Sequence, residues 1–151
     1  DRSPSRGLGD VYKRQPQAYN GIYGTKKLQH MHLLGKVLSS ACSTYNEEIA
    51  WIILKKDELA HYDVDIEDTH AFINNLLILD NVKVACMFRD DGDQVKISMR
   101  SSGLHDVGEI AIALGGGGHS HSAATLINKT ETETLENIVS DVISRIEVIL
   151  N

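Results

Sequence analysis

Four consecutive glycines, Gly115 to Gly118, are followed directly by His119. Glycine loses more backbone freedom on folding than any other residue, so a run of four is poor material for a core. Its use is bare backbone, which a large ligand can approach and whose N–H groups can point at an anion. The pattern therefore predicts a phosphate-binding loop, to which the imidazole of His119 adds a donor. The structural alternatives are a flexible loop or a helix C-cap, for which one glycine would be enough.

Two familiar glycine motifs do not fit this run. A P-loop requires a lysine and then a serine or threonine directly after its last glycine, whereas this chain has His119 and Ser120 there. The dinucleotide fingerprint requires a further glycine at position 120 or 121, and these positions hold Ser120 and His121. Any phosphate site here must therefore take its cation from elsewhere in the chain.

The charge balance limits the class of partner. The chain has 151 residues, enough for one domain with a real core, and a net charge of −6. Residues 1–15 show no periodic apolar pattern and resemble translated sequencing-adapter sequence. They hold four basic and two acidic residues, so the remaining residues carry 11 basic and 19 acidic side chains, a net charge of −8. A protein that coats long nucleic acid is usually basic. The acidity favours a local cluster of donors that binds a short or end-on anion.

The spacing of the cysteines indicates a reducing compartment, and the hydropathy pattern predicts no membrane span. Cys42 and Cys86 lie far apart without metal-ligand spacing, which predicts two buried thiols. The sequence has no apolar run of about 20 residues and no secretory signal pattern. We therefore expect a cytoplasmic protein without a membrane partner.

Hydrophobic spacing predicts an α/β fold with a mixed sheet of about four to five strands, containing a β-hairpin and flanked by helices. Residues 1–15 are set apart as non-native, residues 16–43 as an inter-lobe linker helix and residues 44–151 as the domain. In the N-terminal half the predicted elements are a helix at 25–42, capped by Thr25 with Leu28 and Met31 inward, a strand at 49–54, a helical turn at 56–61, and a helix at 68–79 with Phe72, Ile73, Leu76 and Leu79 inward.

In the C-terminal half a hairpin is predicted at 82–100, followed by a short helix capped by Asp106 and a strand at 123–127. A long helix follows from about 135, with a capping box at Thr130 and Glu133.

The hairpin also predicts a register. A four-residue turn at 90–93 would pair Phe88 with Val95 and keep the apolar residues of both strands on one face. On the opposite face it would pair Lys83 with Arg100. Like charges directly across a ladder are unfavourable, so this pair is either well solvated or awaits an anion.

These segments resemble a known family. The stretch from Lys96 to Gly103, the Asp106-Val107 and Ile110-Ala111 pairs and the GGGGH run are similar to the C-terminal signature of DHH-family phosphoesterases, S-x-R-S, D-V-x-x-I-A and G-G-G-G-H-x-x-A-A-G. That signature belongs to the DHH-associated substrate-binding domain. Residues 22–38 and 68–90 further resemble the bacterial oligoribonucleases that also hydrolyse 3′-phosphoadenosine 5′-phosphate.

The resemblance implies a two-lobed enzyme. The other lobe of the family carries an Asp-His-His motif and two manganese ions, which clamp the oxygens of a phosphoester. This chain contains no Asp-His-His. We therefore expect a substrate-binding lobe without its catalytic lobe, inactive alone, with no cofactor and no catalytic residue of its own. The implied partners are short single-stranded RNA or nucleotide phosphates, the catalytic lobe, and a second copy bound through that lobe.

The resemblance also assigns site residues. Arg100 is implied to contact substrate phosphate, for which a guanidinium offers bidentate donors. Thr125 stands where the family pattern has glycine. The full set of implied phosphate-binding residues is Arg100, Ser101, Gly115, Gly116, Gly117, Gly118 and His119, with Lys83 and Arg89 as an extension of the phosphate face.

Other readings stay open at this point. Within the superfamily, a RecJ-type exonuclease, a cyclic-dinucleotide phosphodiesterase or a polyphosphate hydrolase would share the signature. Outside it, the chain could be an RNA-binding module like the related domain of alanyl-tRNA synthetases, or a protein-interaction domain that binds no phosphate. A metal at His119 and His121 would need further ligands, and Trp51 is more typical of core than of a base-stacking platform.

Overall fold

The computed structural model describes residues 26–151. The predictions on residues 1–25, including the Thr25 cap, lie outside the described residues. Along the chain the elements are α3 (Leu28–Ser39), β1 (Cys42–Ser43), β2 (Ile49–Lys55), α4 (Lys56–Tyr62), the 3₁₀ helices η1 (Ile66–Thr69) and η2 (Phe72–Ile78), β3 (Val84–Asp90), β4 (Gln94–Ser101), α5 (Val107–Ala113), β5 (Gly117–Gly118), β6 (Ser122–Asn128) and α6 (Leu135–Leu150).

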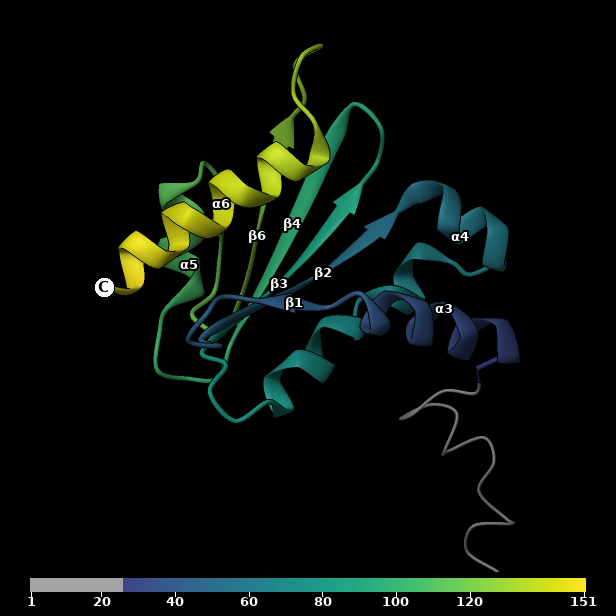
Figure 1. Ribbon diagram of the computed structural model, residues 1–151, viewed down its shortest axis with the longest axis horizontal. Helices are drawn as coiled ribbons and strands as arrows, with labels where there is room; N and C mark the ends of the chain where they lie inside the picture. Colours follow the sequence, from purple (N-terminus) through teal and green to yellow (C-terminus); the bar gives the residue numbers. More distant parts are fainter. Residues whose placement is uncertain (1–25) are drawn as a thin grey trace, which may run out of the picture.

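The strands form one mixed sheet in the order β1-β2-β3-β4-β6-β5. The pair β2 and β3 is parallel and the other pairs are antiparallel. This confirms the α/β prediction, with six strands of which β1 and β5 have two residues each. Figure 1 shows α5 and α6 on one side of the sheet and α3 and α4 on the other.

The two faces of the sheet are covered to different extents. On one face, α5 and α6 pack over β2, β3, β4 and β6, where Phe88, Ile97 and Met99 are fully buried. On the other face, α3 and η2 cover β2 and β3 through Leu33 and Phe72. No residue of β4 or β6 belongs to this second core. The second face of β4 and β6 is therefore left open, and that is where the candidate site lies.

The hairpin is present, but its predicted register is wrong by two residues. Phe88 pairs with Ile97, and Asp91 and Gln94 bond across the turn, the Asp91 N–H donating to the Gln94 carbonyl at 2.9 Å. The turn is thus the two residues Gly92 and Asp93, and Gly92 has a φ of 99°. A two-residue hairpin turn with glycine first suits the twist of the strands. A slip of two residues keeps every side chain on its predicted face.

The predicted helix at 68–79 is instead two 3₁₀ helices, η1 and η2. The Asn75 side chain donates to the Phe72 carbonyl at 3.0 Å, so a side chain takes a backbone acceptor that an α-helix would use. Phe72 is buried as predicted, whereas Leu79 is 49% exposed.

The predicted helix at 25–42 is shorter and turned differently. Helix α3 buries Leu33 and Val37 against the sheet, while Leu28 and Met31 are exposed. The assignment of residues 16–43 as an inter-lobe linker stays a prediction.

The two predicted C-terminal helices are both present, as α5 and α6. Asp106 caps α5 by accepting from the Glu109 N–H at 3.2 Å. Helix α6 begins one turn later than the predicted box, because Thr134 is its N-cap and accepts from the Asn137 N–H at 3.1 Å. Thr130 and its Glu133 contact form a turn before the helix.

Only one of the two cysteines is buried. Cys42 is exposed, contrary to prediction, because it lies on the short edge strand β1. Cys86 is buried in β3, and burial raises the pKa of its thiol to about 12. Among residues 26–151 no helix is both long and apolar enough to cross a bilayer.

Candidate functional site

Strand β4 presents a row of polar side chains on the open face. Lys96, Ser98 and Arg100 alternate with the buried residues of the strand. Strand β6 places Ser122 directly opposite Arg100 and Ala124 directly opposite Ser98. Directly paired residues share a face of the sheet, so all of these side chains gather on one side.

These residues line a cavity of about 300 Å³. Strand β5 contributes Gly117, which pairs with Ala124. His70, between η1 and η2, is the one contribution from the helical layer of that face. The complete lining is His70, Lys96, Ser98, Arg100, Gly117, Gly118, Ser122, Ala123 and Ala124.

The lining has cationic and hydroxyl donors and no carboxylate. Within residues 26–151, no carboxylate lies within ion-pair distance of the Lys96 ammonium or the Arg100 guanidinium. The Arg100 guanidinium donates from Nη1 to the Met99 carbonyl at 3.3 Å, and within residues 26–151 its other N–H groups have no hydrogen-bond partner. An anion is the ligand that this set of donors suits.

The glycine run divides into two halves. The N–H of Gly115 donates to the Ile112 carbonyl at 3.0 Å, and the N–H of Gly116 donates to the Ala111 carbonyl at 2.7 Å. These bonds close the C-terminus of α5, as in the helix-cap alternative. Only Gly117 and Gly118 line the cavity, so the predicted contribution of N–H groups to an anion does not fit the first two glycines.

Close packing explains why side chains are absent from this run. A Cβ at Gly116 would lie 2.2 Å from the Ala124 carbonyl oxygen, and one at Gly118 would lie 2.5 Å from Ala123 Cα. At Gly117 a Cβ would meet nothing within 4 Å. Gly116 and Gly118 thus let the chain lie against β6, while Gly117 leaves bare backbone beside the cavity.

Ser101 and His119 lie beside the cavity and do not line it. Ser101 faces the buried side of β4, and its Oγ accepts from the Gly103 N–H at 3.0 Å. His119 is exposed, and its backbone N–H donates to the Ser122 carbonyl at 2.8 Å. Both residues brace the loops that frame the site.

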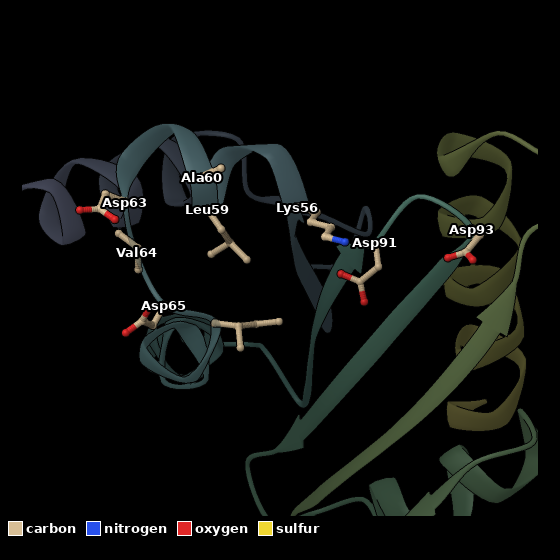
Figure 2. A pocket seen from close by; sticks show the side chains of 9 residues that line it. Lys56, Leu59, Ala60, Asp63, Val64, Asp65, Asp91 and Asp93 are labelled. Atoms are coloured by element: carbon tan, nitrogen blue, oxygen red, sulfur yellow. The ribbon is translucent and has the colours of Figure 1, made fainter.

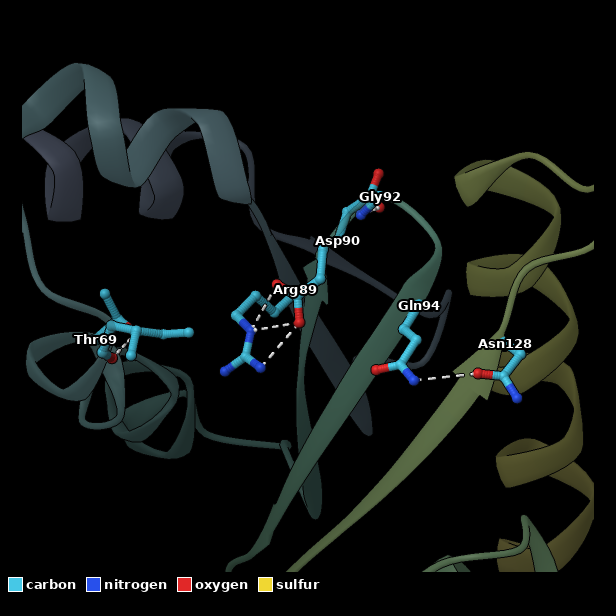
Figure 3. Close-up of polar contacts among 8 residues, drawn as sticks. Thr69, Arg89, Asp90, Gly92, Gln94 and Asn128 are labelled. Atoms are coloured by element: carbon cyan, nitrogen blue, oxygen red, sulfur yellow. Dashed lines mark hydrogen bonds and ion pairs between the residues drawn. The ribbon is translucent and has the colours of Figure 1, made fainter.

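The predicted extension, Lys83 and Arg89, also lies outside the cavity lining. Lys83 pairs with Glu48 at 2.9 Å. Arg89 forms a bidentate ion pair with Asp91, from Nε and Nη2, at 3.0 and 2.9 Å (Figure 3). Each cation already has a carboxylate partner.

Sequence reasoning missed Lys96, Ser98, Ser122 and His70. The alternation of β4 could have found the first two, because Lys96, Ser98 and Arg100 share one face at a period of two. Ser122 and His70 enter only through contacts between distant segments.

Thr125 does not obstruct the site, although glycine was expected at its position. It is 3% exposed and faces the α5 side of β6. Its hydroxyl donates to the Leu114 carbonyl at 3.2 Å. The hydroxyl therefore satisfies a carbonyl at the end of α5 and leaves the cavity unchanged.

A second, larger hollow has the opposite electrostatic character. It measures about 640 Å³ and lies between α4, η1 and the hairpin turn (Figure 2). Its charged lining residues are Lys56, Asp63, Asp65, Asp91 and Asp93. Four carboxylates against one ammonium do not suit an anion. Among residues 26–151, no three His, Cys, Asp or Glu side chains are grouped so that they could hold a metal ion.

A family model described as the DHHA1 domain matches residues 52–147. No curated protein matches the sequence. Among solved structures, an exopolyphosphatase-related protein from Bacteroides fragilis is 27% identical with a TM-score of 0.72, over 87% of this chain and 39% of that chain. The chain thus spans about two fifths of that protein.

Two further solved structures are more distant. A pGpG-specific phosphodiesterase, PggH from Vibrio cholerae, is 11% identical with a TM-score of 0.49, over 80% of this chain and 39% of that one. The C-Ala domain of alanyl-tRNA synthetase from Aquifex aeolicus is 15% identical with a TM-score of 0.44, over 64% of this chain and 90% of that one.

Proposed function

Because the chain belongs to the DHHA1 domain family, we propose that it is the substrate-binding lobe of a DHH-family phosphoesterase. In this proposal it binds the phosphate end of a short oligoribonucleotide or of a nucleotide such as 3′-phosphoadenosine 5′-phosphate. The observation that supports it best is the cavity on β4 and β6, which combines two cations with bare glycine backbone and holds no carboxylate.

In this proposal the groups that line the cavity bind different parts of the phosphate. The guanidinium of Arg100 donates to two phosphate oxygens at once. The hydroxyls of Ser98 and Ser122 donate to the remaining oxygens from the two neighbouring strands. Gly117 lets the anion approach the backbone closely, because no side chain stands there.

Size and charge favour a short ligand held by its end. A cavity of about 300 Å³ is at the lower limit of small-molecule sites, so it accommodates a phosphate with part of a sugar. The rest of the chain is acidic and repels a long polyanion. A ligand that enters end-on avoids most of this repulsion.

The hydrolysis itself is proposed for the other lobe. The manganese ions would be held there, since residues 26–151 offer no group of ligands for a metal. We expect this chain to bind the ligand without hydrolysing it. The cytoplasmic location and the pairing of two copies through the catalytic lobe belong to the same proposal.

A polyphosphate ligand is the second candidate. The Bacteroides fragilis protein, 27% identical to this chain, is described as exopolyphosphatase-related. Inorganic tripolyphosphate carries the same anionic groups without sugar or base. Competition between tripolyphosphate and a diribonucleotide ranks the two candidates directly.

The decisive experiment is calorimetric titration of the full 151-residue chain with the 5′-phosphorylated diribonucleotide pUpU. Arg100→Ala should weaken binding about tenfold or more, as expected for a charged hydrogen-bonded partner. Arg145→Ala removes an exposed cation from α6, on the opposite side of the sheet, and should leave binding unchanged. His119→Ala decides whether that exposed imidazole contacts the ligand. A folded chain that does not bind pUpU refutes the proposal.

A further inference from the structure

The cations of the cavity are spread along β4. Lys96 and Arg100 lie four residues apart on the same face, so their Cα atoms are about 13 Å apart in a strand. Ser98 stands midway between them. One phosphate held between Ser122 and the guanidinium of Arg100 therefore leaves the Lys96 end of the row without an anion.

The observed register of β3 and β4 places two cations directly opposite each other at that end. Arg89 on β3 is directly opposite Lys96 on β4, and like charges across a ladder destabilise a sheet. Asp91 neutralises Arg89 through two hydrogen bonds. Lys96 has no such partner within residues 26–151. A bound anion would remove the remaining imbalance at Lys96.

The other neighbour of Lys96 is apolar. Leu126 on β6 pairs directly with Lys96, on the same open face, and is 58% exposed. An exposed aliphatic side chain beside a cation suits a sugar or base attached to a phosphate better than it suits bare phosphate. The surroundings of Lys96 thus favour a nucleotide chain over inorganic polyphosphate.

We propose that Lys96 and Leu126 form a second subsite, which holds the next phosphate and nucleoside of an oligoribonucleotide whose terminal phosphate lies against Arg100. This inference rests on the proposed function and extends it to the ligand's length. The chain would run along β4, with Ser98 between the two phosphates. A ligand with two linked phosphates then binds more tightly than one with a single phosphate.

The test compares uridine 5′-monophosphate, pUpU and inorganic tripolyphosphate as ligands of the full chain. The unaltered chain should bind pUpU at least fivefold more tightly than the mononucleotide. Lys96→Ala should weaken pUpU about fivefold, the effect of a partly exposed charge contact, and change the mononucleotide less than twofold. Leu126→Ala should weaken pUpU without affecting tripolyphosphate. Arg145→Ala is the matched control, and thermal unfolding confirms that each variant is folded.

The outcomes separate the two proposals. Equal weakening of both nucleotides by Lys96→Ala would mean that Lys96 and Arg100 converge on one phosphate, which overturns the second subsite. Tighter binding of tripolyphosphate than of pUpU, with no effect of Leu126→Ala, would overturn the nucleotide chain as ligand. If the unaltered folded chain binds none of the three ligands, the proposed function fails with the inference.

Discussion

The adjacent glycines Gly116 and Gly117 predict opposite effects of the same substitution. Neither has a positive φ, so backbone strain does not distinguish them. A Cβ at Gly116 would lie 2.2 Å from the Ala124 carbonyl oxygen and 2.7 Å from Thr125 Cα, whereas a Cβ at Gly117 would meet nothing within 4 Å. Steric space is therefore the only variable between Gly116→Ala and Gly117→Ala.

The structure sets the size of each effect. Ordinary contact begins at 3.4 Å, so Gly116→Ala must push backbone away by about 1 Å. Such overpacking costs about 1 to 3 kcal/mol, and loss of the bond from Gly116 N–H to the Ala111 carbonyl costs about 1 kcal/mol more. Since alanine also restricts the unfolded chain, which favours folding by about 0.5 kcal/mol, we expect a net destabilisation of about 1.5 to 3.5 kcal/mol.

Gly117→Ala should instead stabilise the domain by about 0.5 kcal/mol, because only the unfolded-state term applies. Its methyl group enters the cavity, so the same variant should bind pUpU more weakly. The assay is urea unfolding followed through the fluorescence of Trp51, the one tryptophan of the chain, which packs against the first core. The midpoint of thermal unfolding should shift by about 3 °C per kcal/mol, downward for Gly116→Ala and upward for Gly117→Ala.

Two results would refute this reasoning. An unfolding free energy for Gly116→Ala within about 0.5 kcal/mol of the unaltered chain, below any ordinary overpacking cost, would mean that the run is not packed against β6. A destabilisation of Gly117→Ala equal to that of Gly116→Ala would mean that the glycines matter through flexibility instead of space.

Three further predictions concern the layers around the site. Partial burial and then the nearby Lys26 hold the pKa of His30 below its ordinary 6.5, and within residues 26–151 its buried Nδ1 has no hydrogen-bond partner. Because the unfolded chain therefore takes up this proton first, the free energy of unfolding should fall as the pH drops below 6.5, and it should fall less in His30→Leu. A thiol reagent should modify exposed Cys42 rapidly and buried Cys86 only on unfolding. Thr134→Ala should destabilise the domain by about 1 kcal/mol through loss of the α6 cap, and Thr130→Ala by less than half as much.

Each of these has a contrary outcome. A pH profile that His30→Leu leaves unchanged would show that the His30 imidazole is not the group that titrates. Two rapidly reacting thiols in the native chain would contradict the burial of Cys86. An equal cost at Thr130 and Thr134 would place the start of the last helix where the capping-box pattern alone predicts it.

The hairpin shows how far local pattern reaches. Alternation alone predicts which residues of β3 and β4 share a face of the sheet, because the period of a strand is two. It does not show that the second face of β3 is also buried, through Ala85 and Met87. The register also depends on the length of the turn, and the sequence pattern allows a turn of two or of four residues. The positive φ of Gly92 suits the two-residue turn, which the structure adopts. In the observed register Arg100 lies opposite Ala85, so the like-charged pair across the ladder is Arg89 and Lys96, not the predicted pair of Lys83 and Arg100.

The site could be predicted in part for the same reason. Arg100 and the last two glycines follow from residue type together with family resemblance, and they do line one cavity. Ser122 and His70 join it only because β6 pairs with β4 and the η1–η2 turn lies over that strand. Contacts between segments that are distant in the sequence cannot be predicted from the local sequence pattern. Gly115 and Gly116 look like their neighbours in the sequence, yet their N–H groups are used by α5.

The alternation of β4 has an evolutionary consequence. Its residues Val95, Ile97 and Met99 are completely buried and hold the domain together, while Lys96, Ser98 and Arg100 between them line the cavity. Mutations at positions 96, 98 and 100 can therefore alter ligand preference with little effect on folding. Under the proposed function, a lineage could therefore move from one phosphorylated ligand to another through these three codons, while selection for stability acts on the residues between them.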